Sequence, residues 1–263
     1  LDLMEYDMER IEVFNEKTLN AHADIKKTDV IILCGGKGTR LRTIVSDRPK
    51  SLAEVGGKPF LDILLEKVHD QGFTRVIVGV GYLKEQIMRH CEKWKEKMEI
   101  EFAEERVPRG TGGAVKNAEQ LVKSDHVIIM NGDSLFPIDF HKVYAQHKKH
   151  DALLSIVLTR VPQGGEYGNV VIDEKGRITN FKEKENTTKE ALVSAGIYYA
   201  KRKIFEYLPE QENYSLEYDI FPGLVNEQCY GVVGEGELID IGVPERYRKA
   251  NELFSRMSRH KDV

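Results

Sequence analysis

The chain has 263 residues, 41% of them hydrophobic and 31% charged, and its formal net charge is −4. This length and composition predict one large α/β domain or two small ones, and they argue against nucleic acid or an anionic membrane as a partner. No apolar run reaches the roughly 18 residues of a membrane span, and the acidic first residues are unlike a signal peptide. The three cysteines, Cys34, Cys91 and Cys229, are widely spaced, which predicts free thiols in a reducing cytoplasm rather than disulfides or a zinc site.

Residues 1–28 are expected to form an N-terminal appendage. They are rich in charge and lack the strand pattern that follows, although Leu3, Met8, Ile11 and Phe14 are spaced loosely like one helical face. This pattern is compatible with packing on the rest of the chain or with a contact in a homo-oligomer. Residues 29–263 contain no repeat, low-complexity segment or linker, so we expect them to form a single domain.

From residue 29 onward, strand and helix patterns alternate, which predicts βαβ units and a parallel sheet. In the first half, strands are expected at residues 30–33, 76–80, 100–103 and 127–130, and helices at 60–71, 84–97 and from 111. The second half is less regular and extends the sheet as a mixed one. Its expected elements are strands at 153–158, 170–172, 178–181 and 193–199, a helix capped by Ser215, and a last helix at 244–259.

A glycine-rich loop follows the first strand and reads Cys-Gly-Gly-Lys-Gly-Thr-Arg-Leu over residues 34–41. Glycines permit a sharp turn and let backbone N–H groups approach a phosphate closely. Arg40 and Lys50 then add two cations suited to phosphate binding. The loop therefore predicts a cradle for the triphosphate of a nucleotide. The simpler alternative is a glycine-rich turn with scattered surface cations.

Two well-known phosphate loops do not match this segment. The dinucleotide fingerprint G-x-G-x-x-G would need glycine at position 41, which is Leu41. The P-loop needs G-K-[ST], but Gly36-Lys37 is followed by Gly38 and Gly57-Lys58 by Pro59.

Two aspartates follow apolar strand patterns. Asp133 comes after residues 127–130, and Asp240 follows Leu238-Ile239. In open α/β sheets, ligands bind at the carboxyl ends of the strands. Two carboxylates there suit Mg²⁺, which prefers oxygen ligands and often bridges substrate phosphates. The alternative is that each aspartate caps a turn at the end of its strand.

The histidines and Cys34 are not expected to take part in chemistry. His141, His147 and His150 fall on one expected exposed helix, and no H-x-x-x-H pair with a third ligand is present. Cys34 lies beside the phosphate loop, but a small core thiol is the simpler interpretation.

The loop Gly-Gly-Lys-Gly-Thr-Arg-Leu at 35–41, followed by Arg-Pro-Lys-Ser at 48–51, resembles the signature of the sugar-1-phosphate nucleotidyltransferases. That signature is G-G-x-G-T-R-L followed by P-K. The resemblance continues through Asp240-Ile241-Gly242 and covers nearly the whole chain from residue 29. It implies a Rossmann-like, three-layer α/β fold with a central mixed, mostly parallel sheet, in which a nucleotide-binding half and a sugar-binding half are merged.

The resemblance implies that the first loop and a second glycine-rich loop, at residues 104–113, sandwich the base. The nucleotide-binding residues it implies are Leu33, Gly35, Gly36, Gly38, Thr39, Glu105, Gly110, Thr111 and Gly112. Relatives often have an apolar residue where Arg109 stands. A plain helix N-terminus is the alternative for this second loop.

Phe181-Lys182-Glu183-Lys184 is similar to the family motif F-x-E-K, whose glutamate binds sugar hydroxyls and whose lysine binds the sugar phosphate. Many relatives have asparagine where Ser194 stands, and a helix N-terminus explains Ser215-x-Glu217-x-Asp219 equally well. The sugar-binding residues implied by the resemblance are Asn131, Tyr167, Gly168, Glu183, Ser194, Gly196 and Glu217. The implied Mg²⁺ ligands are Asp133 and Asp240, and the implied catalytic residues are Arg40, Lys50 and Lys184.

The implied reaction is attack by a sugar 1-phosphate oxygen on the α-phosphorus of a nucleoside triphosphate. The resemblance is strongest to a heptose-1-phosphate guanylyltransferase branch, which implies GTP and a manno-configured heptose 1-phosphate as substrates. A mannose-1-phosphate guanylyltransferase is the second reading, and a thymidylyl- or uridylyltransferase the third. A regulatory, nucleotide-sugar-sensing subunit is the non-enzymatic alternative, and the presence of Arg40, Lys50, Asp133 and Asp240 argues against it.

Overall fold

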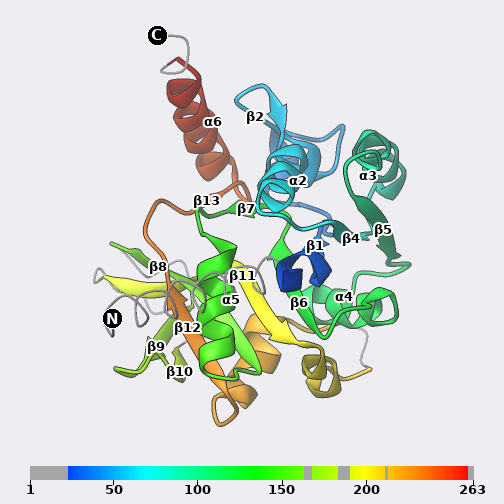
Figure 1. The fold of residues 1–263 in the computed structure, drawn as a ribbon. Coiled ribbons are helices and arrows are strands. Elements are labelled where there is room, and N and C mark those ends of the chain that lie inside the picture. Colours follow the sequence, from blue (N-terminus) through cyan, green and yellow to red (C-terminus); the bar gives the residue numbers. More distant parts are fainter. Residues whose placement is uncertain (1–22, 163–167, 183–189, 211–212, 260–263) are drawn as a thin grey trace, which may run out of the picture.

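The computed structural model describes residues 23–162, 168–182, 190–210 and 213–259 (Figure 1). Its centre is a nine-stranded mixed sheet in the order β10-β9-β11-β6-β1-β4-β5, in which β8 pairs with β11 and β12 pairs with β8. The strands are β1 (Asp29–Leu33), β4 (Arg75–Val80), β5 (Glu99–Glu104), β6 (His126–Asn131), β8 (Leu154–Val161), β9 (Asn169–Ile172), β10 (Ile178–Lys182), β11 (Ala191–Lys201) and β12 (Cys229–Val233).

The first half of the chain forms the parallel part of this sheet. β1 lies between β4 and β6, and Ile31 is in register with Ile77 on one side and Ile129 on the other. These strands are covered on both faces, which is why they are apolar almost without a break. Because antiparallel strands from the second half of the chain join these parallel strands in one sheet, the predicted central mixed sheet is confirmed.

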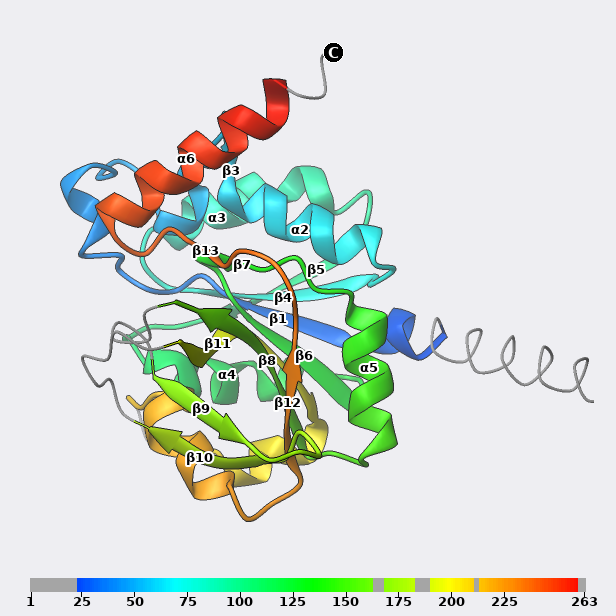
Figure 2. The same ribbon diagram turned by 90° about the vertical axis from the view of Figure 1, so that its left-hand side faces the viewer.

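Helices cover both faces of the sheet, and Figure 2 shows α2 and α3 on one side of the parallel strands and α4 on the other. The helices are α2 (Phe60–Asp70), α3 (Lys84–Cys91), α4 (Gly110–Ala118), α5 (Phe140–Lys149) and α6 (Pro244–Arg259). Val30 and Ile32 pack in one core cluster with α2 and α3, whereas Ile31 packs in the other with α4. Within the described residues, no helix is both long and apolar enough to cross a membrane.

The helix expected at 84–97 is shorter and less exposed than predicted. α3 ends at Cys91, and a 3₁₀ turn, η3 (Glu92–Trp94), follows it. Trp94 is buried and donates its indole N–H to Asp62 Oδ1 at 2.7 Å, while Lys93 Nζ donates to Asp62 Oδ2 at 2.7 Å. These contacts with α2 turn the chain inward where helical periodicity alone would continue the helix.

The second half of the chain extends the sheet with antiparallel strands. β11 runs antiparallel to β6, β8 and β9, and its register with β8 shifts between Ser194 and Tyr198. Ser215 caps a short π-helix, η7 (Leu216–Ile220), and a 3₁₀ turn, η8 (Phe221–Leu224), follows. Two small ribbons complete the fold: β7 (Ser134–Leu135) with β13 (Ile239–Asp240), and β2 (Glu54–Val55) with β3 (Lys58–Pro59).

The end of the predicted appendage packs against the domain. Residues 23–27 are helical, and Ile25 is fully buried in the core. Tyr144 on α5 donates a hydrogen bond to the carboxylate of Asp24. Residues 1–22 lie outside the described part of the chain.

The prediction that α5 presents its histidines to solvent is wrong for His147. This side chain is fully buried, with Nδ1 2.9 Å from Ser155 Oγ and its ring 4.6 Å from that of Tyr199. Burial, together with the neighbouring His126, lowers the pKa of His147 from 6.5 to about 3. His147 is therefore a neutral core residue.

The burial of His147 predicts a fold that weakens in acid. Between about pH 6.5 and pH 3, His147 is protonated in the unfolded chain but not in the folded one. The free energy of unfolding therefore falls by about 1.4 kcal/mol for each pH unit by which the pH is lowered. Urea unfolding between pH 4 and pH 8 measures this slope. His147→Gln is expected to flatten it, while His69→Gln, at an exposed histidine, is expected to leave it unchanged. Equal slopes in all three proteins would contradict this account.

Candidate active site

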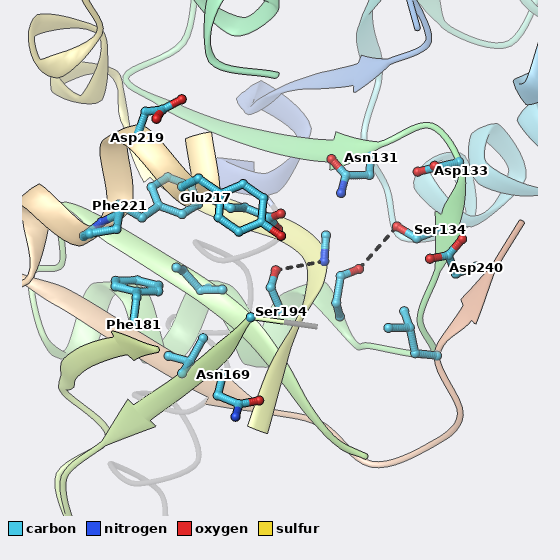
Figure 3. Close-up of a pocket in the computed structure, with 18 of the residues that line it drawn as sticks. Asn131, Asp133, Ser134, Asn169, Phe181, Ser194, Glu217, Asp219, Phe221 and Asp240 are labelled. Atoms are coloured by element: carbon cyan, nitrogen blue, oxygen red, sulfur yellow. Dashed lines mark hydrogen bonds between the residues drawn. The ribbon is translucent and has the colours of Figure 1, made fainter. Parts of the chain in front are cut away.

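The ribbon β7–β13 brings Asp133 and Asp240 together. Asp240 is in register with Ser134, and Ile241 donates its N–H to Asp133 O at 2.9 Å. A Cβ on Gly242 would lie 2.9 Å from Asp240 Oδ1 and 3.5 Å from Asp133 Oδ2. The two carboxylates thus face one small space that a glycine leaves open, and Figure 3 shows them at the same end of a pocket.

Each of these carboxylates has a cationic partner. Lys50 forms an ion pair with Asp133, and Arg246 Nη1 lies 2.8 Å from Asp240 Oδ2. Burial, and then repulsion from Asp133, raises the pKa of Asp240. The sequence reasoning missed Arg246, although its place four residues beyond Gly242, at the start of the last helix, was a usable signal.

The two carboxylates fit a hard divalent cation better than a soft one. Their donors are oxygens, and they flank a common space. Among the described residues, no group of three or more His, Cys, Asp or Glu side chains converges as a metal cage would. The pair therefore suits an ion such as Mg²⁺, whose other ligands are waters and substrate phosphates.

The predicted phosphate loop lies next to this pair. Gly38 has a φ of +58°, and a Cβ there would lie 3.1 Å from Lys50 Cβ, so the loop folds directly over Lys50. Leu41 is buried and fixes the far end of the loop, while Arg40 is exposed and lines the pocket. Cys34 is buried beneath, and burial raises its pKa to about 12, so it is a poor nucleophile. The expected set of Arg40, Lys50 and the two aspartates thus meets at one place.

Glu105 lies at the ends of three neighbouring strands. A Cβ on Gly35 would come within 2.4 Å of Glu105 Oε2, and one on Gly81 within 3.3 Å, so the carboxylate lies against two glycines. Burial raises the pKa of Glu105 to about 7, although Arg109 opposes the shift. Its Oε1 is buried and has no hydrogen-bond partner among the protein atoms. Beside a phosphate loop, such an acceptor is suited to donors from a ligand.

Two glycines of the second loop, Gly110 and Gly112, have a packing role. Gly110, with a φ of +66°, lies against Tyr214 O, and a Cβ on Gly112 would collide with the Tyr214 ring at 2.2 Å. Thr111 Oγ1 accepts a hydrogen bond from Leu216 N at 2.9 Å. These contacts join the second loop to the segment that leads into η7.

A pocket of about 670 Å³ extends from Asp133 and Asp240 into the second half of the chain (Figure 3). Its walls come from the ends of β6, β9 and β10, from residues 194–196 within β11, and from η7 and η8. The predicted residues that line it are Arg40, Asn131, Asp133, Gly168, Ser194, Gly196, Glu217 and Asp240. The structure therefore gathers these residues from segments far apart in the sequence.

A hydrogen-bonded chain forms one wall of the pocket. Gly196 N donates to Ser194 Oγ at 3.1 Å, Ser194 Oγ is 3.3 Å from Tyr198 Oη, and Tyr198 donates to Glu217. Burial raises the pKa of Tyr198 well above its usual range, so its hydroxyl stays protonated and remains a donor. This series of hydrogen bonds fixes the Glu217 carboxylate at the wall of the pocket.

The end of the pocket farthest from Asp133 and Asp240 combines aromatic rings with carboxylates. Figure 3 shows Phe181, Phe221, Glu217 and Asp219 there. Tyr218 also lines the pocket and is 53% exposed, which leaves much of its surface uncovered. The sequence reasoning did not single out Tyr218 or Phe221, because their shared placement depends on a π-helix.

Three predicted site residues, Tyr167, Glu183 and Lys184, lie outside the described part of the chain. Leu33 ends β1, and its carbonyl accepts a hydrogen bond from Gly132 N at 3.0 Å. Gly36 and Thr39 are exposed on the first loop.

Comparison with known proteins identifies the family. The model of the nucleotidyl transferase family matches residues 29–256. The D-glycero-alpha-D-manno-heptose 1-phosphate guanylyltransferase of Aneurinibacillus thermoaerophilus is 35% identical over 225 residues, covering 85% of this chain and 97% of that protein. The mannose-1-phosphate guanylyltransferase of Mycobacterium tuberculosis is 30% identical, covering 84% of this chain and 63% of that protein.

A solved structure agrees with these relatives. HddC from Yersinia pseudotuberculosis, complexed with GMP-PN, has a TM-score of 0.76 and 34% sequence identity, covering 86% of this chain and 99% of that one. The fold, the glycine-rich loop and the paired aspartates lead to the same conclusion. The chain belongs to the nucleotidyl transferase family.

Proposed function

We propose that this enzyme transfers GMP from GTP to D-glycero-α-D-manno-heptose 1-phosphate, releasing pyrophosphate. The observation that carries this proposal is the difference between the two ends of the pocket. Arg40, Asp133 and Asp240 line the end suited to phosphates, where Lys50 forms an ion pair with Asp133. Carboxylates and aromatic rings suited to a sugar line the opposite end. The guanylyltransferase relatives support this choice of substrates. A cytoplasmic location, where GTP is made, would suit the reaction.

Glu105 supports guanine as the base. Guanine presents two adjacent donors, N1–H and the N2 amino group, and an ionised carboxylate can accept from both. Uracil and thymine present a single N–H donor between two carbonyl groups, which a carboxylate would repel. The carboxylate of Glu105 lies with Oε2 against Gly35 and Gly81, and its Oε1, which has no hydrogen-bond partner among the protein atoms, is the acceptor that guanine needs.

The chain's own residues supply positioning and charge. Arg40 binds the β- and γ-phosphates, and Lys50 neutralises the α-phosphate while the new O–P bond forms and the bond to pyrophosphate breaks. Asp133 and Asp240 would hold Mg²⁺, which when bound screens the repulsion between the two anionic substrates. The hydrogen-bonded wall of Ser194 and Glu217 orients the sugar.

The decisive experiment measures pyrophosphate release with Mg²⁺ for GTP, ATP, CTP, UTP and dTTP, each with heptose 1-phosphate, mannose 1-phosphate or glucose 1-phosphate. We expect the highest kcat/KM for GTP with the heptose. Highest activity with mannose 1-phosphate would favour the second candidate, which the mycobacterial relative supports. The absence of turnover with every pair would favour a regulatory, nucleotide-sugar-sensing subunit.

Tyr218 is expected to distinguish a heptose from mannose, whose exocyclic chain is shorter by one hydroxylated carbon. Its exposed ring, beside Glu217 and Asp219, offers an apolar surface and acceptors to an extended, hydroxylated side chain. Tyr218→Ala should lower kcat/KM for heptose 1-phosphate about tenfold more than for mannose 1-phosphate. Tyr230→Ala, whose ring stacks on His150 instead, is the matched control. An equal loss with both sugars would remove Tyr218 from this selection.

A further inference from the structure

Asp240 is held by the segment that opens α6. Its Oδ1 accepts from Gly242 N at 2.5 Å, and its Oδ2 accepts from Arg246 Nη1 at 2.8 Å. Gly242 lies two residues before this helix begins, and Arg246 lies in its first turn. The position of α6 therefore decides where both oxygens of this carboxylate point.

One face of α6 docks on the hairpin β2–β3. Tyr247 donates its hydroxyl to Glu54 O at 2.7 Å, and Asn251 Oδ1 accepts from Gly56 N at 3.1 Å. Phe254 packs so closely on Gly56 that a Cβ there would lie 2.7 Å from Phe254 Cβ. The spacing of 247, 251 and 254 places all three side chains on the same helical face. Figure 1 shows α6 standing beside β2 at the edge of the molecule.

The docked hairpin is continuous with the segment that carries Lys50. A 3₁₀ turn, η2 (Lys50–Leu52), ends one residue before β2, and Ala53 N donates to Lys50 O at 3.0 Å. Arg48 Nη1 also lies 3.0 Å from Glu54 Oε1. One helix thus connects the segment that bears Asp240 with the segment that bears Lys50, the partner of Asp133.

We propose that α6 is a positioning element of the active site, with Arg246 as its positioning residue and Tyr247, Asn251 and Phe254 as its dock. It sets the separation between Asp240 and the Lys50–Asp133 pair. A magnesium-type ion needs nearly ideal octahedral geometry, so its two carboxylates must be held in place before substrates arrive. Displacement of a reacting group by about 1 Å can cost roughly a hundredfold in rate. The catalytic readout of this inference rests on the proposed function, whereas its structural readouts do not.

The test removes the dock without touching the aspartates. In the double variant Tyr247→Phe, Asn251→Ala, we expect hydrogen exchange at the amides of residues 240–246, of which Pro244 has none, to become at least tenfold faster. We expect the Kd for Mn²⁺, read from the electron paramagnetic resonance of the free ion without substrates, to rise about tenfold. The kcat should fall at least tenfold while the KM for GTP stays within about twofold. Arg248→Ala, at an exposed position of α6, is the control and should change none of these.

A second variant approaches the dock from the other side. Gly56→Ala places a methyl group against Phe254 at a residue with a φ of +60°, and it should reproduce the same pattern with the melting transition retained. Unchanged exchange at residues 240–246 in both variants would overturn the proposal. Faster exchange and weaker Mn²⁺ binding in an enzyme that does not use GTP would uphold the positioning role and reject the proposed function instead.

Discussion

Replacing Lys50 by methionine is expected to lower kcat by roughly 10²–10³-fold while the protein stays folded. Lys50 Nζ already contacts Asp133, so it sits where the α-phosphate and the cation would meet. The lost positive charge matters most while negative charge is transferred to the leaving pyrophosphate. The loss should therefore appear mainly in kcat rather than in the KM for GTP, as measured by pyrophosphate release.

Lys58→Met provides the matched control for this variant. Lys58 lies on the hairpin that follows Lys50, and it also forms an ion pair with a carboxylate, that of Glu66. Its side chain is about twice as exposed as that of Lys50, and its removal should leave turnover unchanged. Near-normal turnover of Lys50→Met, with a melting temperature like that of the wild type, would remove Lys50 from the mechanism.

Replacing Glu105 by glutamine is expected to lower kcat/KM for GTP roughly a hundredfold. The substitution turns one acceptor oxygen into an NH₂ donor that faces the donors of guanine, and it leaves buried polar groups unpaired. Inosine triphosphate, which lacks the N2 amino group, provides a second readout. The wild-type enzyme should prefer GTP over it clearly, whereas the variant should treat the two alike.

The same carboxylate predicts a pH dependence. Burial raises the pKa of Glu105 to about 7, so the acid is largely protonated below that pH and cannot accept both guanine donors. The KM for GTP should therefore fall as the pH rises through 7, and this trend should be absent in Glu105→Gln. Glu104→Gln, at the exposed neighbour paired with Lys84, should behave like the wild type. If Glu104→Gln lost its selectivity for GTP as strongly as Glu105→Gln, the role given to Glu105 would be contradicted.

The parts of the site that sequence could predict are those that depend on local patterns. The phosphate loop and Asp133 each follow a recognisable apolar strand, so their place at the edge of the sheet follows from order along the chain, whereas Asp240 lies within β13, in a separate ribbon with β7. Contacts between distant segments could not be found that way. The pairing of Arg246 with Asp240 and the packing of Glu105 against Gly35 and Gly81 depend on tertiary structure.

The burial of His147 differs from these tertiary contacts, because a signal for it was present in the sequence. Phe140, Val143, Tyr144 and His147 are spaced i, i+3, i+4 and i+7, and all four are buried. A polar residue type led to an expectation of exposure where its position on the apolar face of the helix indicated the core. The early end of α3, in contrast, follows from the Asp62–Trp94 contact, which periodicity does not reveal.

The ribbon β7–β13 has a consequence for synthesis on the ribosome. The strands that frame the phosphate loop are complete once β6 has emerged, so the nucleotide-binding half can begin to fold while translation continues. Asp133 then waits for a partner strand that is translated more than a hundred residues later. A nascent chain that stops short of Asp240 would carry a nucleotide cradle without a complete catalytic centre, so premature termination should yield products that bind the nucleotide but do not turn it over.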